Sequence, residues 1–284
     1  MGAHVSMAAP MANDVADVLS YGEVAVHGGT VPIWMAGEGT PVILLHGWTL
    51  DHRMWTPQIA GLASEHFLVM PDRRGCGRAV APPDLMREAD DVIAIADFLG
   101  FERFALVGLS RGAVVALDVA RRFGSRLTGL VVSGAPLPAL VEREEVIDLD
   151  ALRALAAAGD LERMRAEWSR HSLMQTHSPD ARALMFEILA DYDGRDLLAP
   201  SQTPGFPREV LALLPMPVLA MTGEHDTPWR RDCVAALAKV APRAMQALVP
   251  DAGHLANADN PPRFNALVSA FLRNCSDPRT RPNS

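Results

Sequence analysis

The feature that most restricts the fold of this chain is a series of short apolar runs separated by segments of helical periodicity. The runs are bounded by proline or glycine, and they occupy residues 41–46, 67–72, 104–108, 127–133, 217–223 and 247–250. A continuous apolar run of this length is typical of a strand buried on both faces of a sheet. Strands of this kind that alternate with helices predict a doubly wound, mostly parallel α/β sheet, with ligand sites at the carboxyl ends of the strands.

Two segments are expected to be helices that cross over between such strands. Residues 90–99 carry apolar side chains at helical spacing, residues 111–123 follow a predicted strand directly, and each segment ends before a glycine. Ahead of the sheet, residues 22–27 and 31–36 mix β-branched and polar positions, and Gly28–Gly29 between them suits a primed turn. The sequence therefore predicts an antiparallel N-terminal hairpin beside the parallel strands.

The pattern changes between residues 137 and 210, where polar-rich helical segments replace the strand-like runs. Ser178 and Pro179 suit the N-cap and the first position of one of these helices. We interpret a helical block inserted between two strands of a sheet as a cap. The predicted organisation is a flexible leader, a core in two parts, a helical cap and a disordered tail, at residues 1–19, 20–136 with 211–274, 137–210, and 275–284.

Composition and charge exclude several classes of function. The chain has 284 residues and a net charge of −8 without a basic block, so no binding to nucleic acid or to a membrane surface is expected. It has no long apolar run and no basic signal-peptide start, and Cys76, Cys233 and Cys275 are expected to be free thiols. We therefore expect a cytoplasmic protein, monomeric or homodimeric, that acts on a small molecule.

The motif that carries chemistry is Gly108-Leu109-Ser110-Arg111-Gly112, which matches G-x-S-x-G. It lies between a predicted strand and a predicted helix, the context in which this motif forms a sharp turn that exposes the serine. The glycines are needed because side chains two residues on either side of the serine would clash in such a turn. The turn also places the serine at the N-terminus of a helix, where the dipole favours developing negative charge.

A serine nucleophile needs a base and a group that orients the base. Asp226 and His254 each follow a predicted strand late in the chain, in the order Ser…Asp…His. Because the carboxyl ends of parallel strands meet at one edge of a sheet, both are expected close to Ser110. Two alternatives for the acid stay open, namely Glu224 and a carboxylate that follows Ser133.

The predicted strands, the helical cap and the order Ser…Asp…His together resemble an α/β-hydrolase of the capped, small-molecule type, and the chain is similar to enol-lactonases of that superfamily. The resemblance covers residues 21–273. It is carried by His46-Gly47-Trp48, Asp72-Arg73-Arg74-Gly75-Cys76-Gly77, the turn at Ser110, Gly223–Asp226 and Gly253–His254.

The resemblance implies a role for each residue at the matching positions. Ser110 is the nucleophile, His254 is the general base and then the general acid, and Asp226 holds the tautomer of the imidazole. The backbone N–H groups of Trp48 and Arg111 form the oxyanion hole, and no metal or organic cofactor is implied.

Side chains near these groups are candidates for substrate binding. Trp48 and Trp229 are expected to line an apolar pocket, and the Arg111 side chain either meets a substrate carboxylate or lies on the surface. His46 is expected to be structural, with its ring bonded to the loop that shapes the oxyanion hole. Arg73–Arg74 are expected to pair with local carboxylates, which contributes at most about 1 kcal/mol for exposed groups.

The expected function is hydrolysis of a carboxylic ester or lactone of a small, largely apolar substrate through an acyl-enzyme. The resemblance excludes epoxide hydrolases and haloalkane dehalogenases, which carry an aspartate at the position of Ser110. Two alternatives stay open. In the first, the same triad acts on a carbon–carbon or amide bond. In the second, the protein has the same fold but is a non-hydrolytic cyclase or decarboxylase, or a ligand receptor. For the carbon–carbon reaction, the cap arginines that would hold a carboxylate are Arg165, Arg170, Arg182 and Arg195.

Overall fold

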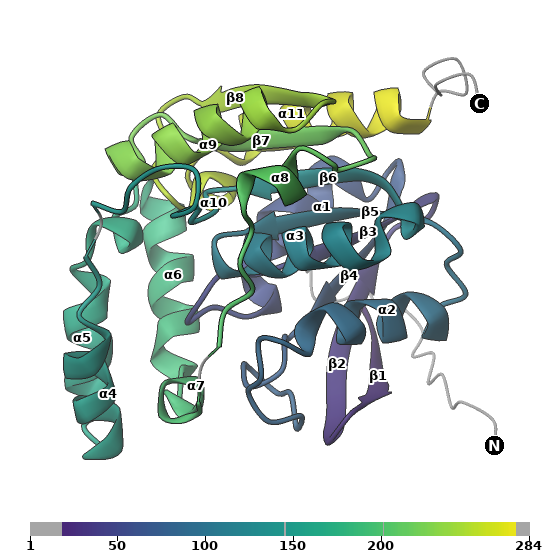
Figure 1. The fold of residues 1–284 in the computed structure, drawn as a ribbon. Coiled ribbons are helices and arrows are strands. Elements are labelled where there is room, and N and C mark those ends of the chain that lie inside the picture. Colours follow the sequence, from purple (N-terminus) through teal and green to yellow (C-terminus); the bar gives the residue numbers. More distant parts are fainter. Residues whose placement is uncertain (1–18, 145, 201, 277–284) are drawn as a thin grey trace.

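The computed structural model describes residues 19–144, 146–200 and 202–276, which form an eight-stranded sheet flanked by helices (Figure 1). The predicted leader lies outside the described residues except for Leu19. The predicted tail also lies outside them except for Cys275 and Ser276, which form the end of a helix. Within the described ranges, no helix is long and apolar enough to span a bilayer.

The strands of the sheet match the six apolar runs and the predicted hairpin. Their order in space is β1-β2-β4-β3-β5-β6-β7-β8, with antiparallel pairing of β1 with β2 and of β2 with β4, and parallel pairing elsewhere. The prediction of a mostly parallel sheet with an N-terminal antiparallel hairpin is confirmed. The bounds are β1 Ser20–Val26, β2 Gly29–Ala36, β3 Thr40–Leu45, β4 His66–Pro71, β5 Phe104–Leu109, β6 Leu127–Ser133, β7 Val218–Gly223 and β8 Ala244–Val249.

Both faces of the central strands are buried, which explains why their runs are apolar throughout, whereas the edge strands β1 and β8 are largely exposed. In strand β5, Ala105, Val107 and Leu109 belong to the hydrophobic core on one face. Phe104 and Leu106 belong to the core on the other face, as the two-residue period of a strand requires.

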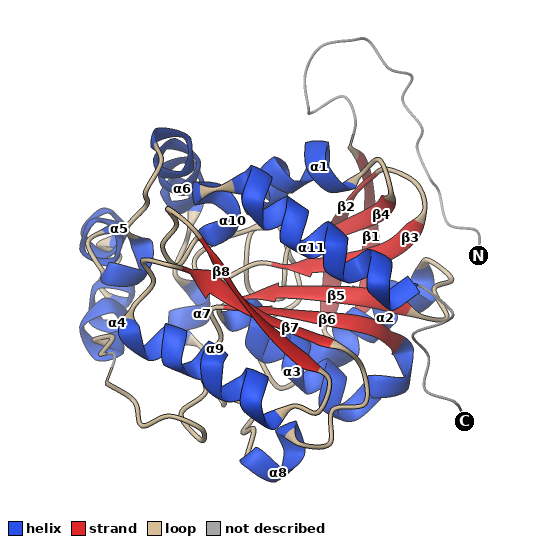
Figure 2. Ribbon diagram, turned by 90° about the horizontal axis from the view of Figure 1, so that it is seen from above, coloured by secondary structure: helices blue, strands red, loops and turns tan. Residues whose placement is uncertain are grey.

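Helices cover both faces of the sheet (Figure 2). One face is covered by α1 (Thr56–Leu62) and α11 (Pro261–Ser276), and the other by α2 (Glu88–Phe98), α3 (Arg111–Phe123) and α9 (Pro228–Val240). Helices α2 and α3 are the two predicted crossover helices. The core also contains the short elements η2 (His52–Trp55), η3 (Gly124–Arg126) and α10 (Ala256–Asp259).

The chain between β6 and β7 is helical, and Figure 1 shows α4, α5 and α6 on one side of the core. Ser178 is the N-cap of α6, where its Oγ accepts the N–H of Ala181 at 3.1 Å, and Pro179 is the first helical residue. Residues 137–210 are called the cap below. Its elements are α4 (Leu149–Ala157), α5 (Leu161–Ser169), η4 (Ser172–Met174), α6 (Pro179–Asp191), α7 (Arg195–Leu198) and α8 (Arg208–Leu211), the last of which ends one residue beyond it.

The hairpin turn differs from the predicted one. The two residues between the paired Val26 and Gly29 are His27 and Gly28, and of these only Gly28 has a positive φ, at 84°. Both primed turns require a positive φ at the first central residue, so the prediction of a primed turn at Gly28–Gly29 is wrong.

The two arginines after β4 pair with carboxylates, as expected, and the pairs are buried. Arg73 and Arg74 are 4% and 2% exposed, and they pair with Glu88 and Asp91 of helix α2 at 2.7 Å and 2.6 Å. Helix α2 presents its carboxylates to this loop, which allows both charges to be buried because each is paired and hydrogen-bonded. The ion pairs are therefore internal parts of the fold rather than surface contacts.

Candidate active site

Ser110 stands at the turn between β5 and α3, with φ 54° and ψ −113°. A positive φ is uncommon for a residue that has a β-carbon, and it marks a backbone held in place by its surroundings. The N–H of Ser110 donates to the carbonyl of Ser133 at the end of β6, at 2.8 Å. Ser110 is also the N-cap of α3, so it lies at the positive end of a helix of 13 residues.

The two glycines of the motif allow the sharp turn. A β-carbon on Gly108 would lie 2.4 Å from the carbonyl oxygen of Gly112. A β-carbon on Gly112 would lie 2.2 Å from the carbonyl oxygen of Leu45, in strand β3. Both distances are shorter than any tolerated contact, in agreement with the steric reason given for these glycines.

The structure brings Asp226 and His254 together. Asp226 follows β7 and His254 follows β8, and the Nδ1 atom of His254 lies 2.8 Å from Oδ2 of Asp226. Both side chains are almost fully buried, at 4% and 0% exposure for His254 and Asp226 respectively. Glu224, the alternative acid, is exposed, and its carboxylate faces the N–H of Asp251 at 3.4 Å.

The carboxylate of Asp226 is held in its ionised form. Burial opposes ionisation, but the charge and the hydrogen bond of His254 together with a hydrogen bond from the Thr222 hydroxyl outweigh it, so the pKa of Asp226 lies below its usual value. The N–H of Thr227 also donates to Oδ1 at 2.7 Å. An ionised Asp226 requires the proton of a neutral His254 to be on Nδ1.

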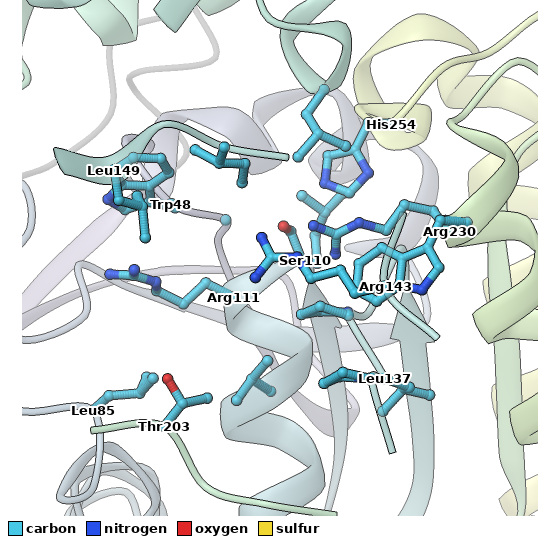
Figure 3. Close-up of a pocket in the computed structure, with 18 of the residues that line it drawn as sticks. Trp48, Leu85, Ser110, Arg111, Leu137, Arg143, Leu149, Thr203, Arg230 and His254 are labelled. Atoms are coloured by element: carbon cyan, nitrogen blue, oxygen red, sulfur yellow. The ribbon is translucent and has the colours of Figure 1, made fainter. Parts of the chain in front are cut away.

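The other imidazole nitrogen, Nε2 of His254, is then a lone-pair acceptor. It is buried and has no hydrogen-bond partner among the described residues. His254 and Ser110 line the same cavity, where Figure 3 shows both side chains. A buried acceptor without a partner, in the cavity that holds the serine, is suited to take the proton of a reacting hydroxyl.

The two N–H groups expected to bind an oxyanion are also available. Trp48 and Arg111 line the cavity with Ser110. Neither backbone N–H donates to another group in the described part of the chain. The N–H of Arg111 is free because it belongs to the first turn of α3, where no intrahelical acceptor exists.

His46 supports the loop that carries Trp48. Its Nε2 accepts the N–H of Arg73 at 3.0 Å, so Nδ1 is the protonated atom that donates to the carbonyl of Gly47 at 2.8 Å. Burial and the charge of Arg73 lower the pKa of His46 to about 3, which keeps the ring neutral. A neutral ring that bonds through both nitrogens fits the structural role expected of His46.

The cavity has a volume of about 360 Å³ and a mostly apolar wall. Its charged side chains are Arg111, Arg143 and Arg230, and none of the described lining residues is a carboxylate. The guanidinium of Arg230 donates to the carbonyl of Gly134 at 2.7 Å and lowers the pKa of Asp226 by its charge.

The structure places the predicted substrate contacts as follows. Trp48 and Trp229 both line the cavity, and the indole N–H of Trp229 donates to the carbonyl of Val141 at 3.2 Å. The guanidinium of Arg111 lies 2.9 Å from a carboxylate oxygen of Asp196, so the carboxylate that it meets belongs to the protein.

Sequence reasoning missed three residues near the site, Asp196, Arg143 and Arg230. Asp196 is 148 residues from Trp48, to which it bonds, and no spacing connects the two. A signal existed for Arg230, since it lies four residues after Asp226 in the first turn of a helix, where a cation is unfavourable by itself. The four cap arginines proposed to hold a substrate carboxylate do not line the cavity.

Among the described residues, one group of side chains has the composition of a metal site, but it lies in a second cavity. Asp51, His52 and Asp72 bring one ligand atom each within 4.8 Å of one another. Their carboxylates already bind protein groups, because Arg53 pairs with Asp51 and the N–H and the ring of His52 bond to Asp72. These residues therefore support the loop after β3.

An eight-stranded sheet of this order, with a serine at a strand–helix turn and helices inserted after β6, defines an α/β-hydrolase fold. The chain belongs to the alpha/beta hydrolase family, whose sequence profile matches residues 42–267. It is 28% identical over 269 residues to a putative carbamate hydrolase RutD from Caulobacter sp. (strain K31), an alignment that covers 87% of this chain and 94% of the relative. It is 26% identical to 3-oxoadipate enol-lactonase 1 from Acinetobacter baylyi, with coverage of 87% and 94%.

A solved structure of the same fold is a thermophilic esterase from Thermogutta terrifontis. The two structures have a TM-score of 0.74 at 24% sequence identity, over 91% of this chain and 100% of the esterase. Identity at this level establishes the shared fold and leaves the substrate of this chain to be argued from its own site.

Proposed function

We propose that this protein is a serine hydrolase that cleaves a carboxylic ester or lactone of a small, largely apolar molecule. The observation that carries the proposal is the 2.8 Å contact between His254 and Asp226, with the partnerless Nε2 of His254 in the cavity of Ser110. Esterases and an enol-lactonase among the similar proteins support the same bond type.

The proposed reaction has two halves. In the first half, Nε2 of His254 takes the proton of the Ser110 hydroxyl as Oγ attacks the substrate carbonyl. The carbonyl oxygen becomes an anion that accepts the N–H groups of Trp48 and Arg111. His254 then gives its proton to the leaving alcohol oxygen, and the acyl group stays on Ser110.

In the second half, water takes the place of the alcohol. Nε2 of His254 removes a proton from the water, whose oxygen attacks the acyl carbonyl. The bond to Oγ breaks, Ser110 regains its proton, and a carboxylic acid leaves. Asp226 stabilises the imidazolium that forms in both halves, because its ionised carboxylate lies 2.8 Å from Nδ1.

The cavity indicates the size and polarity of the substrate. Leu50, Leu173 and Met174 contribute to the apolar wall, and a volume of about 360 Å³ lies within the range of small-molecule sites. The carbon–carbon alternative loses the four cap arginines named for it, which do not line the cavity, although Arg143 of the cap does.

The test combines covalent labelling with turnover. Wild-type protein and Ser110→Ala are treated with a fluorophosphonate and measured by intact mass, and both are assayed with p-nitrophenyl esters from acetate to octanoate. We expect one adduct and ester turnover in the wild type, and neither in the variant. An unlabelled wild type, or a variant that keeps a tenth of the rate, would overturn the proposal.

If the wild type is labelled but the p-nitrophenyl esters turn over slowly, the same assay is repeated with five- and six-membered lactones and with aryl amides. Faster turnover of lactones than of amides supports the proposed bond type. Faster turnover of amides favours the amide alternative instead.

A further inference from the structure

The carboxylate of Asp196, on the short cap helix α7, contacts the side chains of both residues assigned to the oxyanion hole. Its Oδ2 atom accepts the indole N–H of Trp48 at 2.8 Å and the guanidinium of Arg111 at 2.9 Å. Its Oδ1 atom accepts the hydroxyl of Tyr192. The Asp196 side chain is only 5% exposed, and a buried charge persists only when it is paired and hydrogen-bonded in this way.

The loop that carries Trp48 is held in an unfavourable backbone conformation. The next residue, Thr49, has a φ of 63°, which is rare for a β-branched side chain. Its hydroxyl accepts the indole N–H of Trp168, on cap helix α5, at 2.9 Å. Trp168 also packs on Trp48, with ring centroids 4.6 Å apart. Two consecutive loop residues are therefore fixed by side chains of the cap.

A strained loop keeps its conformation only while its surroundings hold it there. The cap supplies two of these restraints, the bond from Trp168 to Thr49 and the bond from Trp48 to Asp196. The backbone between His46 and Thr49 includes the N–H of Trp48, and Trp48 lines the cavity. Loss of a restraint would let this N–H turn away from the position of the oxyanion.

The same carboxylate also fixes the other donor. Arg111 is the first residue of α3, and its guanidinium lies 5.3 Å from the centre of the Trp48 ring as well as on Asp196. The side chains of the two donor residues thus share one acceptor atom. A residue of the cap therefore links two donor residues that lie 63 positions apart in the chain.

We propose that Asp196 is a positioning residue, whose carboxylate holds both donor residues of the oxyanion hole in place through its bonds to Trp48 and Arg111. The inference rests on the proposed function, because it assigns Asp196 to the same site. Asp196 does not touch the reacting atoms and acts through Trp48 and Arg111. The cap is then part of the catalytic geometry and not only a cover over the substrate.

The test is the variant Asp196→Asn, which keeps the size of the side chain and removes its charge. An amide offers one acceptor atom where the carboxylate offers two, and it has no charge to hold the guanidinium of Arg111. Misplacement of a catalytic group by about 1 Å costs about 100-fold in rate, so we expect a loss of about 10- to 100-fold in kcat. KM for a p-nitrophenyl ester should stay within about threefold.

A second readout separates a positioning role from a structural one. A trifluoromethyl ketone forms a tetrahedral adduct with a serine and places an oxyanion in the hole. Its affinity should fall by about the same factor as kcat, because only the oxyanion uses the misplaced N–H groups.

The matched control is Arg195→Ala, the neighbouring residue of α7. The Arg195 guanidinium joins the same helix to the core through the carbonyls of Gly75 and Gly77, at 3.0 Å and 2.9 Å, and does not reach Trp48 or Arg111. This variant should lose thermal stability but keep kcat within about twofold. Should Asp196→Asn fail to fold, Trp48→Phe removes the indole donor and should lower kcat and ketone affinity together.

Three outcomes would overturn the inference: an unchanged kcat in Asp196→Asn, a rise in KM alone, or an equal loss of kcat in Arg195→Ala. Each of these leaves the proposed function intact, because wild-type turnover and labelling of Ser110 are measured in the same series. A wild type that shows neither turnover nor labelling counts against both proposals.

Discussion

Gly134 lies against the imidazole ring of His254, so closely that a β-carbon at position 134 would stand 2.7 Å from Cε1 of that ring and 2.9 Å from Nδ1. Gly134 directly follows β6 and has a φ of 58°. Its carbonyl accepts the guanidinium of Arg230 at 2.7 Å. The end of β6 therefore forms a wall behind the histidine and limits how the ring can rotate.

We expect Gly134→Ala to impair activity more than stability. The added methyl group would displace the imidazole of His254 from Asp226 and Ser110, and kcat should fall by about 100-fold. Gly100→Ala is the matched control, because Gly100 has a φ of 72° and a β-carbon at this position would meet nothing within 4 Å. Ester assays and thermal unfolding of both variants give the comparison, and equal kcat values would disprove the steric role of Gly134.

The acid of the triad can be tested against its neighbour. Asp226→Asn should lower kcat by about 10⁴, because a neutral amide neither fixes the Nδ1 proton of His254 nor stabilises the imidazolium. Glu224→Gln changes the exposed acid two residues away and should leave kcat unchanged. Steady-state kinetics with circular dichroism as a folding control decide between them, and a larger loss in Glu224→Gln would reassign the acid.

The buried ion pair between Arg73 and Glu88 should matter for stability. Both side chains are nearly inaccessible, at 3% and 7% exposure, so Glu88→Gln leaves an uncompensated charge inside the protein and should cost about 3 kcal/mol or more. The surface pair of Arg87 with Asp84, at 46% and 41% exposure, is the control. Asp84→Asn should cost less than about 1 kcal/mol in the same urea titration, and similar losses in both variants would show that burial adds nothing to the pair.

His46 should make stability depend on pH. Its pKa is about 3 in the folded protein, whereas an unfolded histidine titrates near 6.5. Between these values the unfolded chain binds the extra proton, so stability is fully present above about pH 6.5 and falls by up to about 1.4 kcal/mol per pH unit as the pH drops toward 3.

The variant His46→Gln isolates this contribution, because all other titrating groups are common to both proteins. Urea unfolding between pH 4.5 and 7.5 should give a shallower slope for the variant. Parallel slopes for the two proteins would mean that His46 is not neutral in the fold.

Local patterns in the chain were enough to predict the framework. The apolar runs of the central strands were predictable because both faces of the sheet are covered there, so a strand such as β5 has no position exposed to water. The turn at Ser110 was predictable because its glycines are required by contacts of 2.4 Å and 2.2 Å with the backbone. Asp226 and His254 were predictable as neighbours because parallel strands end at one edge.

Features that depend on how separate elements meet were not predictable. The pairing of Arg73 and Arg74 with local carboxylates was expected, but its burial and the partners Glu88 and Asp91 of helix α2 were not. Trp168, on cap helix α5, lines the cavity and packs on Trp48, a contact that no periodicity indicates.

The sequence by itself thus determined the sheet, the nucleophile turn and the identity of the candidate triad, because each depends on backbone geometry that a short segment encodes. Only the tertiary structure decided that Asp196 binds Trp48 and Arg111, and that the carboxylate met by Arg111 is internal. The physical reason is that a hydrogen bond between residues 148 positions apart depends on where the whole cap is seated. That seating is a sum of many side-chain contacts, and no local pattern records it.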